Sequence, residues 1–342
     1  MSPSRPPQGV GIAEVAAEAG VSTASVSRAL SGRGHVSPAT RRKVEEAAGR
    51  LGYVVSSSAS SLASGRTRSI GLLSPTLGRW YFSALAGAIT DELTRAGYDT
   101  TLYSVTEQAA EREALFGSVM RRRRVDALVA VAVDLQPSEQ GALGEIGLPL
   151  LGVGGRLPGF PSLTTDEAGM ARQATEHLLG LGHRRIAHLG GSAEFDVDFH
   201  VPGQRRAGWE EALRAAGVEP EPALHVTADF TVAGARGATR ALLGSGTVPT
   251  AIFAASDEMA IGALIAAQQM GFRVPEDLSI VGIDGHPLGE VLGLTTLDQH
   301  VSALGTSAAR HLVNHLDEGA PLCEEKAPHH LVVRTSTARP AA

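Results

Sequence analysis

The stretch IAEVAAEAGVSTASVSRALSG, residues 12–32, sets the architecture of the amino-terminal part of this 342-residue chain. It contains two short segments with helical apolar periodicity, separated by a turn at Gly20. Ser22 lies at the start of the second segment, where its hydroxyl can accept hydrogen bonds from the first free N–H groups of a helix. The apolar positions are Ile12, Val15, Ala16 and Ala19 in the first segment, and Val26, Ala29 and Leu30 in the second. The pattern predicts two short helices that pack across the glycine turn.

A third helix is predicted over residues 38–51. Ser37 stands at the capping position, Pro38 at the first helical position, and Gly52 where the helix should end. The apolar stripe of this helix consists of Val44, Ala47, Ala48 and Leu51. Three short helices with a tight second turn form either a small bundle or a helix-turn-helix module.

The outward face of the second helix favours the helix-turn-helix interpretation. Thr23, Ala24 and Arg28 point away from its apolar stripe. Small side chains at a helix N-terminus let the backbone approach a DNA groove closely, and an arginine one turn further can read the edge of a guanine. We therefore expect this helix to lie in the major groove of DNA.

The distribution of charge agrees with a nucleic-acid partner for the head alone. The chain has a formal net charge of −6, but residues 1–68 hold nine Lys/Arg and four Asp/Glu, a charge of +5. The remaining 21 basic and 32 acidic side chains give the rest of the chain −11. A basic head on an acidic body indicates that only the head meets a polyanion.

The segment IAEVAAEAGVSTASVSRALSGRGHVSPATRRKVEEAAGRLGYV, residues 12–54, strongly resembles the DNA-binding head of the lactose-repressor/galactose-repressor (LacI/GalR) family. The resemblance implies that Thr23, Ala24 and Arg28 read bases in the major groove. It also implies DNA contacts, mainly to the backbone, from Ser22, Ser27, Ser31 and His35.

Residues 56–68, SSSASSLASGRTR, have the composition of a flexible Ser/Gly linker. In the family that the head resembles, this segment is a hinge that folds into a short helix on the operator. The resemblance implies that Leu62 is wedged into the minor groove and that Ala59 lies one turn before it. Val55 and Ser56 stand where the family often has a Pro-Asn pair, and the serines are weak helix formers.

From residue 69 onward, short apolar runs alternate with longer helical patterns, which predicts parallel sheets with helices on both faces. The pattern occurs twice, over about 69–160 and 184–290, and so predicts two similar α/β lobes with a cleft between them. Ligands of such sheets bind beyond the carboxyl ends of the strands. The runs are SIGLLSP, DTTLYSV, VDALVAVAV, LPLLGVG, RRIAHLGG, ALHVTAD, TAIFAAS and LSIVGIDG.

The expected organisation is therefore a helix-turn-helix head over residues 1–55, a hinge over 56–68, and a two-lobed domain over 69–342. The last part resembles the effector domain of the same family, which is similar to periplasmic sugar-binding proteins. Its segments TTDEAGMARQATEHLLGLGHRRIAHLGG and DEMAIGALIAAQQMGFRVPEDLSIVGID are close matches. This domain is expected to bind a small-molecule effector and to form the dimer.

The resemblance also implies an effector site. Its expected polar ligands are Arg205, Ser256, Asp257 and Asp284, with Phe230 as a stacking aromatic, and with Arg79, Trp80 and Tyr81 on the other lobe. Arginine and carboxylate side chains suit vicinal hydroxyls, and an aromatic ring suits the apolar face of a sugar. Asp257 is equally well explained as a helix cap, and Phe230 as a core residue.

Three departures bear on the effector. Gly154 and Ser256 stand where sugar-binding members often have Asp and Asn, and an Asn-Pro-Phe-Phe-like run is replaced by residues 79–82, RWYF. The loss of a carboxylate and the gain of Arg79 favour an effector that is more anionic, larger or stacked on aromatic rings than a plain hexose.

Other classes of protein are disfavoured. No catalytic set, cofactor site or metal site is predicted, and Cys323 is the only cysteine in the sequence. Residues 1–10, MSPSRPPQGV, lack the apolar core of a secretion signal, and no apolar run approaches the roughly 20 residues of a membrane span. The sequence is therefore expected to be a cytosolic, ligand-responsive regulator, most simply a repressor of sugar or related catabolic genes. It should bind a pseudo-palindromic operator as a homodimer.

Overall fold

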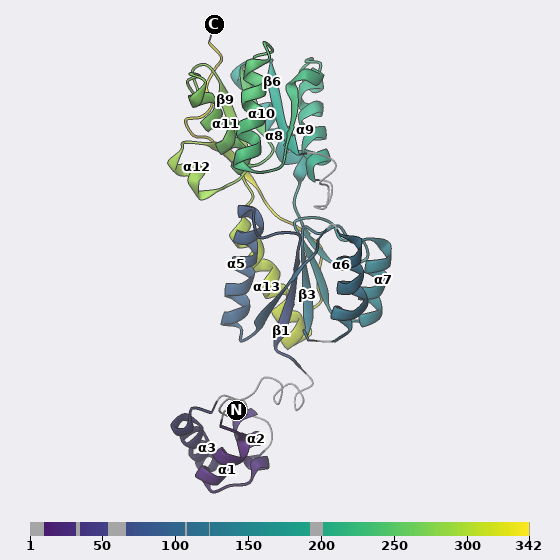
Figure 1. Ribbon diagram of the computed structural model, residues 1–342, viewed down its shortest axis with the longest axis vertical. Helices are drawn as coiled ribbons and strands as arrows, with labels where there is room; N and C mark the ends of the chain where they lie inside the picture. The colour runs from purple at the N-terminus through teal and green to yellow at the C-terminus, as the bar shows by residue number, and fades with distance from the viewer. Residues whose placement is uncertain are drawn as a thin grey trace, which may run out of the picture. The chain divides into compact units, whose positions relative to one another are not determined.

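The computed structural model describes residues 10–31, 35–53, 66–106, 108–122, 124–191 and 201–341 (Figure 1). The chain forms two compact units, Met1–Arg68 and Ser69–Ala342. Within the described residues, no helix is long and apolar enough to cross a lipid bilayer.

The first unit contains the three predicted helices, α1 (Ile12–Ala19), α2 (Thr23–Ser31) and α3 (Pro38–Leu51). Gly20 and Gly52 adopt left-handed backbone conformations with φ of 65° and 62°, and both end a helix as predicted. The hydroxyl of Ser37 accepts a 3.1 Å hydrogen bond from the backbone N–H of Thr40. The core of this unit is formed by Val15, Ala16, Val26, Ala29, Val44, Ala47 and Ala48.

The first lobe of the second unit is built on a sheet with the strand order β11-β5-β4-β3-β1-β2. Its strands are β1 (Ser69–Ser74), β2 (Asp99–Ser104), β3 (Ala127–Val131), β4 (Leu150–Val153), β5 (Ser162–Thr164) and β11 (Glu325–Lys326). Its helices are α5 (Trp80–Arg95), α6 (Ala109–Ala114), α7 (Pro137–Ile146) and α13 (Val301–Glu318), with a π-helical turn at Leu115–Val119 and a 3-10 turn at Met120–Arg122. Figure 1 shows α5 and α13 on one side of this sheet, and α6 and α7 on the other.

The second lobe repeats this architecture with the strand order β12-β10-β9-β8-β6-β7. Its strands are β6 (Ile186–Gly191), β7 (His225–Ala228), β8 (Ala251–Ala254), β9 (Ser279–Asp284), β10 (Thr295–Asp298) and β12 (His330–Val332). Its helices are α8 (Glu167–Leu181), α9 (Val201–Ala215), α10 (Val232–Gly244), α11 (Asp257–Gln269) and α12 (Pro287–Val291), with a 3-10 turn at Pro222–Leu224. Strands in both sheets pair in parallel, except that β12 runs antiparallel to β10.

Burial explains why the central strands were visible in the sequence. All residues of β3, β4, β8 and β9 are buried, because helices cover both faces of each sheet. The predicted α/β class and the eight predicted strands are confirmed. The short outer strands β5, β10, β11 and β12 were not predicted.

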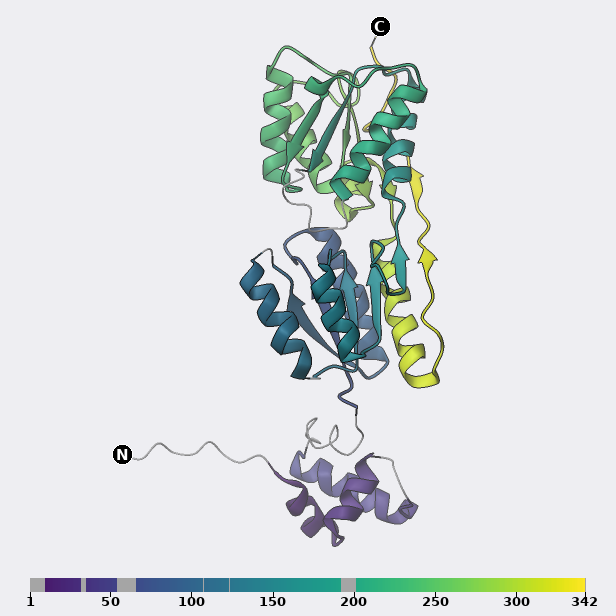
Figure 2. The same ribbon diagram turned by 90° about the vertical axis from the view of Figure 1, so that its right-hand side faces the viewer.

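The lobes are not continuous in sequence. Within the described residues, the chain passes between them three times, after β5, after β10 and after β11. Residues 301–326 therefore return to the first lobe, which the twofold pattern in the sequence did not indicate. Figure 2 shows the yellow carboxy-terminal part of the chain leaving α13 and β11 on the first lobe and continuing along the side of the second lobe.

A glycine at the contact between α10 and α11 provides a test of this packing. A Cβ atom at Gly262 would lie 2.5 Å from the carbonyl oxygen of Val232 and 2.8 Å from Cβ of Ala235. We expect Gly262→Ala to lower the free energy of unfolding by about 1–3 kcal/mol, because the two helices must separate. Urea denaturation followed by circular dichroism measures this change.

Gly237→Ala is the matched control, because Gly237 is exposed on α10 and a Cβ there meets no atom within 4 Å. Alanine has the higher helix propensity, so this variant should be as stable as the parent or slightly more stable. Equal unfolding midpoints for Gly262→Ala and the parent would contradict the close packing.

Candidate DNA-binding face and effector pocket

The outer face of α2 carries the side chains that the sequence assigned to DNA. Ser22, Thr23, Ala24, Ser27 and Arg28 are all exposed. The Ser22 hydroxyl accepts a 3.2 Å hydrogen bond from the backbone N–H of Ser25, which confirms its capping role. Nε of Arg28 donates to the carbonyl oxygen of Ala24 at 3.1 Å, so the guanidinium lies along the helix surface. Most side chains on this face are small, several carry hydroxyl groups, and all are accessible to solvent. These properties suit a helix that enters a DNA groove.

The remaining residues assigned to DNA lie next to undescribed segments of the chain or within them. His35 is exposed on the segment before α3. Ser31 is the last residue of α2, and its side chain is not described. Ala59 and Leu62, the predicted hinge residues, lie outside the described residues.

A pocket of about 460 Å³ lies between the two lobes of the second unit, where strands of both sheets end. Six of the eight residues predicted for the effector line it: Arg79, Tyr81, Arg205, Phe230, Ser256 and Asp284. The other lining residues are Phe82, Ala132, Gly154, Glu167, Val201 and Glu258.

A buried ion network forms one wall of the pocket. Arg205 on α9 is 5% exposed, and its Nη2 lies 2.6 Å from Oε2 of Glu167 on α8. Its Nε donates to the same oxygen at 2.7 Å, its Nη1 donates to the carbonyl of Ala255, and Oδ1 of Asp284 lies 3.9 Å from Nη1. Because its partners come from several elements, the guanidinium is held in one orientation.

Asp284 ends β9 at the carboxyl edge of the sheet, has a φ of 136° and lines the pocket. Burial raises the pKa of its carboxyl well above the usual range, and the charge of Arg205 opposes that effect. Nε2 of Gln299 donates to its Oδ1 at 2.9 Å. Arg205 and Gln299 therefore fix the position of this carboxyl beside the pocket.

Arg79 and Phe230 meet across the pocket from different lobes. Cζ of Arg79 lies 4.9 Å from the centroid of the Phe230 ring, which is 7% exposed. Nearby, Oε2 of Glu258 accepts a 3.1 Å hydrogen bond from the backbone N–H of Trp80. Burial raises the pKa of Glu258. These contacts connect the start of α5 to the second lobe.

The Gly154 position shows how the family's usual carboxylate is replaced. Gly154 has a φ of 88°, and a Cβ there would lie 2.8 Å from the hydroxyl oxygen of Tyr81. The Tyr81 hydroxyl therefore occupies space that an aspartate side chain at this position would need. A hydroxyl group from α5 therefore lies beside Gly154, where sugar-binding members of the resembled family often have Asp.

Trp80 and Asp257 lie outside the pocket lining. The Trp80 ring packs on His286, with centroids 4.7 Å apart. Asp257 is fully buried, and burial raises its pKa to about 6. Its Oδ2 accepts hydrogen bonds from the backbone N–H groups of Gly285 (3.0 Å) and His286 (2.8 Å). Its Oδ1 accepts from Oγ1 of Thr296 at 2.7 Å.

Sequence reasoning did not select Glu167 or Glu258 for the site. Glu258 is adjacent to two selected residues, and its place at the first turn of α11 was a usable signal. Glu167 is 38 residues from Arg205, and only the packing of α8 on α9 brings the two together. No spacing rule could have found that pair.

Comparisons with known proteins agree with this description. A model described as bacterial regulatory proteins, lacI family, matches residues 11–56, and a periplasmic binding protein-like domain matches residues 175–337. The ribose operon repressor of Halalkalibacterium halodurans is 35% identical over 95% of this chain and 96% of its own. The regulator CelR of Thermobifida fusca is 33% identical over 88% of this chain and 90% of its own.

Two solved structures extend the likeness to the whole fold. The lac repressor dimer bound to operator and the anti-inducer ONPF has a TM-score of 0.83 and 29% identity, covering 97% of this chain and 100% of its own. A complex of the transcriptional regulator CelR with cellobiose has a TM-score of 0.69 and 31% identity, covering 96% and 99%. The chain belongs to the lacI family of bacterial regulatory proteins and is a transcriptional regulator with a helix-turn-helix head. The relatives named here are regulators of transcription, not enzymes.

The buried carboxylate of Asp257 generates a prediction about stability. Asp257→Ala leaves two backbone N–H groups and one hydroxyl without their acceptor. Each such loss costs about 1–3 kcal/mol, so the three together should lower the free energy of unfolding by at least about 3 kcal/mol. Thermal and urea denaturation at neutral pH measure it.

Asp257→Asn is the matched variant, since its amide oxygen can still accept from Gly285 and His286 while its NH₂ group faces Thr296. Its free energy of unfolding should be close to that of the parent and clearly higher than that of Asp257→Ala. Equal destabilisation of both variants would mean that the charge, rather than the hydrogen bonds, is what the fold requires.

Proposed function

We propose that this regulator is a repressor of sugar catabolic genes, acts in the cytoplasm as a homodimer, and binds a sugar or glycoside in the pocket between its lobes. The observation that carries the effector assignment is the fixed Arg205–Glu167–Asp284 network beside an aromatic ring. Directed donors and acceptors suit vicinal hydroxyls, and a ring suits the apolar face of a pyranose or furanose.

The ligands of similar proteins support the same class. CelR was solved with cellobiose, a regulator from Enterococcus faecium with ribose, and the lac repressor with ONPG. The E. faecium structure has a TM-score of 0.69 and 26% identity to this chain. A monosaccharide or disaccharide is therefore the first class of compound to screen.

Of the three alternatives that the sequence favoured, a more anionic, a larger or an aromatic-stacked effector, the charge of the pocket weighs against the anionic one. Three acidic residues, Glu167, Glu258 and Asp284, line it together with two arginines. The Arg205 guanidinium is already bound by Glu167 and faces Asp284. Arg79 lies over Phe230, where its cation and the ring attract each other. A neutral polyhydroxylated ligand faces no net repulsion from such a set.

For DNA, we assign base reading to Thr23, Ala24 and Arg28, and supporting contacts to the residues beside them. The supporting residues are Ser22, Ser27, Ser31 and His35, with Ala59 and Leu62 in the hinge. One small module buries too little surface for operator-level affinity, so two heads of a dimer should bind two half-sites. The lac repressor, similar over 97% of this chain, was solved as a dimer on operator.

Coupling between the sites is expected to run through movement of the lobes. A ligand that contacts residues of both lobes binds the closed arrangement more tightly than an open one, and so shifts the population toward it. In a dimer, that shift changes how the two first lobes, and the hinges attached to them, are placed across the two-fold axis.

The Tyr81 hydroxyl tests the effector site. We expect Tyr81→Phe to weaken the affinity for the sugar found in a calorimetric screen about 3–10-fold, the effect of losing one hydrogen bond of about 0.5–1.5 kcal/mol. Tyr103→Phe, the same change on β2 outside the pocket lining, is the control and should bind normally. Identical affinities for all three proteins would remove Tyr81 from the effector site.

Arg28 tests the DNA assignment. Selection of duplexes from a random pool should enrich an inverted repeat, and Arg28→Ala should lose about 1–3 kcal/mol at one base pair in each half-site. Binding across substituted duplexes at fixed salt measures the loss. Arg50→Ala, on α3 and paired with Glu18, is the control for removing one positive charge from the head. Weakening that is the same on every sequence would assign Arg28 to the phosphate backbone instead.

A further inference from the structure

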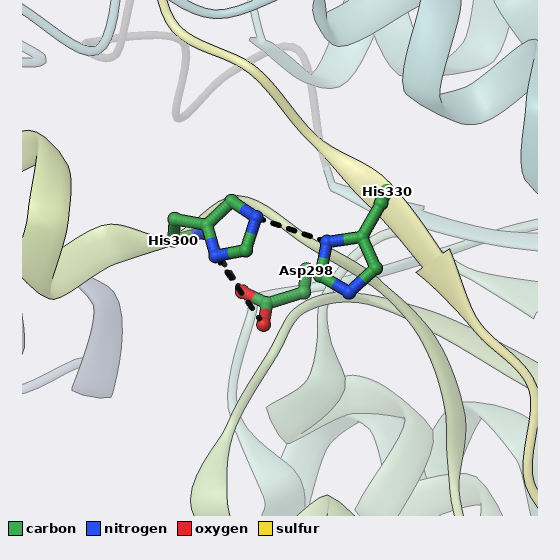
Figure 3. A group of neighbouring side chains, drawn as sticks. All are labelled: Asp298, His300 and His330. Carbon is green, nitrogen blue, oxygen red and sulfur yellow. Dashed lines mark hydrogen bonds and ion pairs between the residues drawn. The ribbon is translucent and has the colours of Figure 1, made fainter.

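Three side chains with metal-binding atoms meet where the chain passes between the lobes. Asp298 is the last residue of β10, His300 precedes α13, and His330 is the first residue of β12 (Figure 3). The antiparallel register of β10 and β12 pairs Asp298 directly with His330. Two connections between the lobes, one after β10 and one before β12, therefore contribute to a single cluster.

One nitrogen of each imidazole is close enough to share an ion, since Nε2 of His300 lies 2.9 Å from Nδ1 of His330. Nδ1 of His300 lies 3.8 Å from Oδ2 of Asp298, but it is the other ring nitrogen and cannot bind the same ion as Nε2. One ligand atom from each residue lies within 4.8 Å of those of the other two. Ligand atoms on a tetrahedral Zn²⁺ ion are about 3.3 Å apart, given bonds of about 2.0–2.1 Å. The Asp298 carboxylate would have to approach the two imidazoles from within 4.8 Å to this spacing when an ion binds.

The surroundings of the cluster suit an ion that retains a water ligand. The side chains of His300 and Asp298 are 40% and 29% exposed, so solvent reaches them. Oδ1 of Asp298 accepts a 2.7 Å hydrogen bond from the backbone N–H of His300, which orients the carboxylate as outer hydrogen bonds do in metal sites. His300 also lines a second cavity, beside α13.

We propose that Asp298, His300 and His330 bind a divalent transition-metal ion, with Zn²⁺ as the best match. Two imidazoles and one carboxylate with an open position form a known donor set for this ion. The ion would join two of the connections that must bend when the lobes move, and would therefore oppose that movement. Gln299, between two of the ligands in sequence, donates to Asp284, so the cluster is one residue away from the pocket wall.

The alternative is a hydrogen bond between the two imidazoles that ties the connections together without a metal. His330→Gln separates the two cases, because a glutamine side chain can still hydrogen bond to His300 but is a poor ligand for Zn²⁺. Asp298→Asn keeps an oxygen that can accept from the His300 backbone while removing the carboxylate charge.

The test uses the untagged full-length protein, stripped of metal with a chelator and titrated with ZnCl₂ by isothermal calorimetry. We expect one Zn²⁺ per chain, with affinity at least tenfold weaker in His330→Gln and in Asp298→Asn. Co²⁺ should give the intense visible absorption of a four-coordinate ion in the parent and lose it in both variants. His329→Ala, which removes a neighbouring imidazole outside the cluster, is the control and should bind Zn²⁺ as the parent does.

Circular dichroism and thermal denaturation verify that each variant is folded before titration. The proposal is overturned if the parent binds no Zn²⁺, or if His330→Gln and Asp298→Asn bind it as tightly as the parent. It is also overturned if His329→Ala loses the ion to the same extent as His330→Gln. None of these outcomes depends on the identity of the effector.

Discussion

The buried guanidinium of Arg205 is the interaction on which the rest of the effector pocket depends. Arg205 is 5% exposed, and a buried charge is stable only when hydrogen-bond partners and opposite charges replace its lost hydration. Those partners are Glu167 on α8, Asp284 on β9 and the carbonyl of Ala255 beyond β8. These contacts hold α8, α9 and the ends of β8 and β9 in fixed positions relative to one another. Arg205, Glu167 and Asp284 also line the pocket between the lobes, so the network that satisfies the buried charge shapes the proposed effector site.

The second constraint is that the lobes exchange chain segments. After β10 the chain leaves the second lobe for α13, and after β11 it returns to form β12. Any movement of one lobe against the other must bend these connections. Asp284 in the pocket, Gln299 beside it, and the Asp298–His300–His330 cluster are joined in sequence or by hydrogen bonds. A ligand in the pocket and an ion at the cluster would therefore act on the same part of the molecule.

Many residues that line the pocket could be predicted from their position near the ends of predicted strands. Arg79, Tyr81, Ser256 and Asp284 were selected because each lies at or just after the end of a predicted strand, at a position where the resembled family binds its effector. All four line the pocket. The same rule selected Trp80 and Asp257, which lie outside the lining and serve a ring contact and a buried hydrogen-bond network. Position after a strand brings a residue to the correct edge of a sheet, but its rotamer and neighbours decide whether it faces the ligand or the core.

By itself, the sequence determined the three-helix head, its caps, the exposed face of α2 and the buried central strands, because these depend on local periodicity and on residues within one turn of each other. Only the tertiary structure decided which distant groups meet. Glu167 finds Arg205 through helix packing, the Tyr81 hydroxyl fills the space beside Gly154, and His330 meets Asp298 through the register of two short strands. The physical reason is that such contacts require chain segments far apart in sequence to fold against each other, and no local pattern records the result.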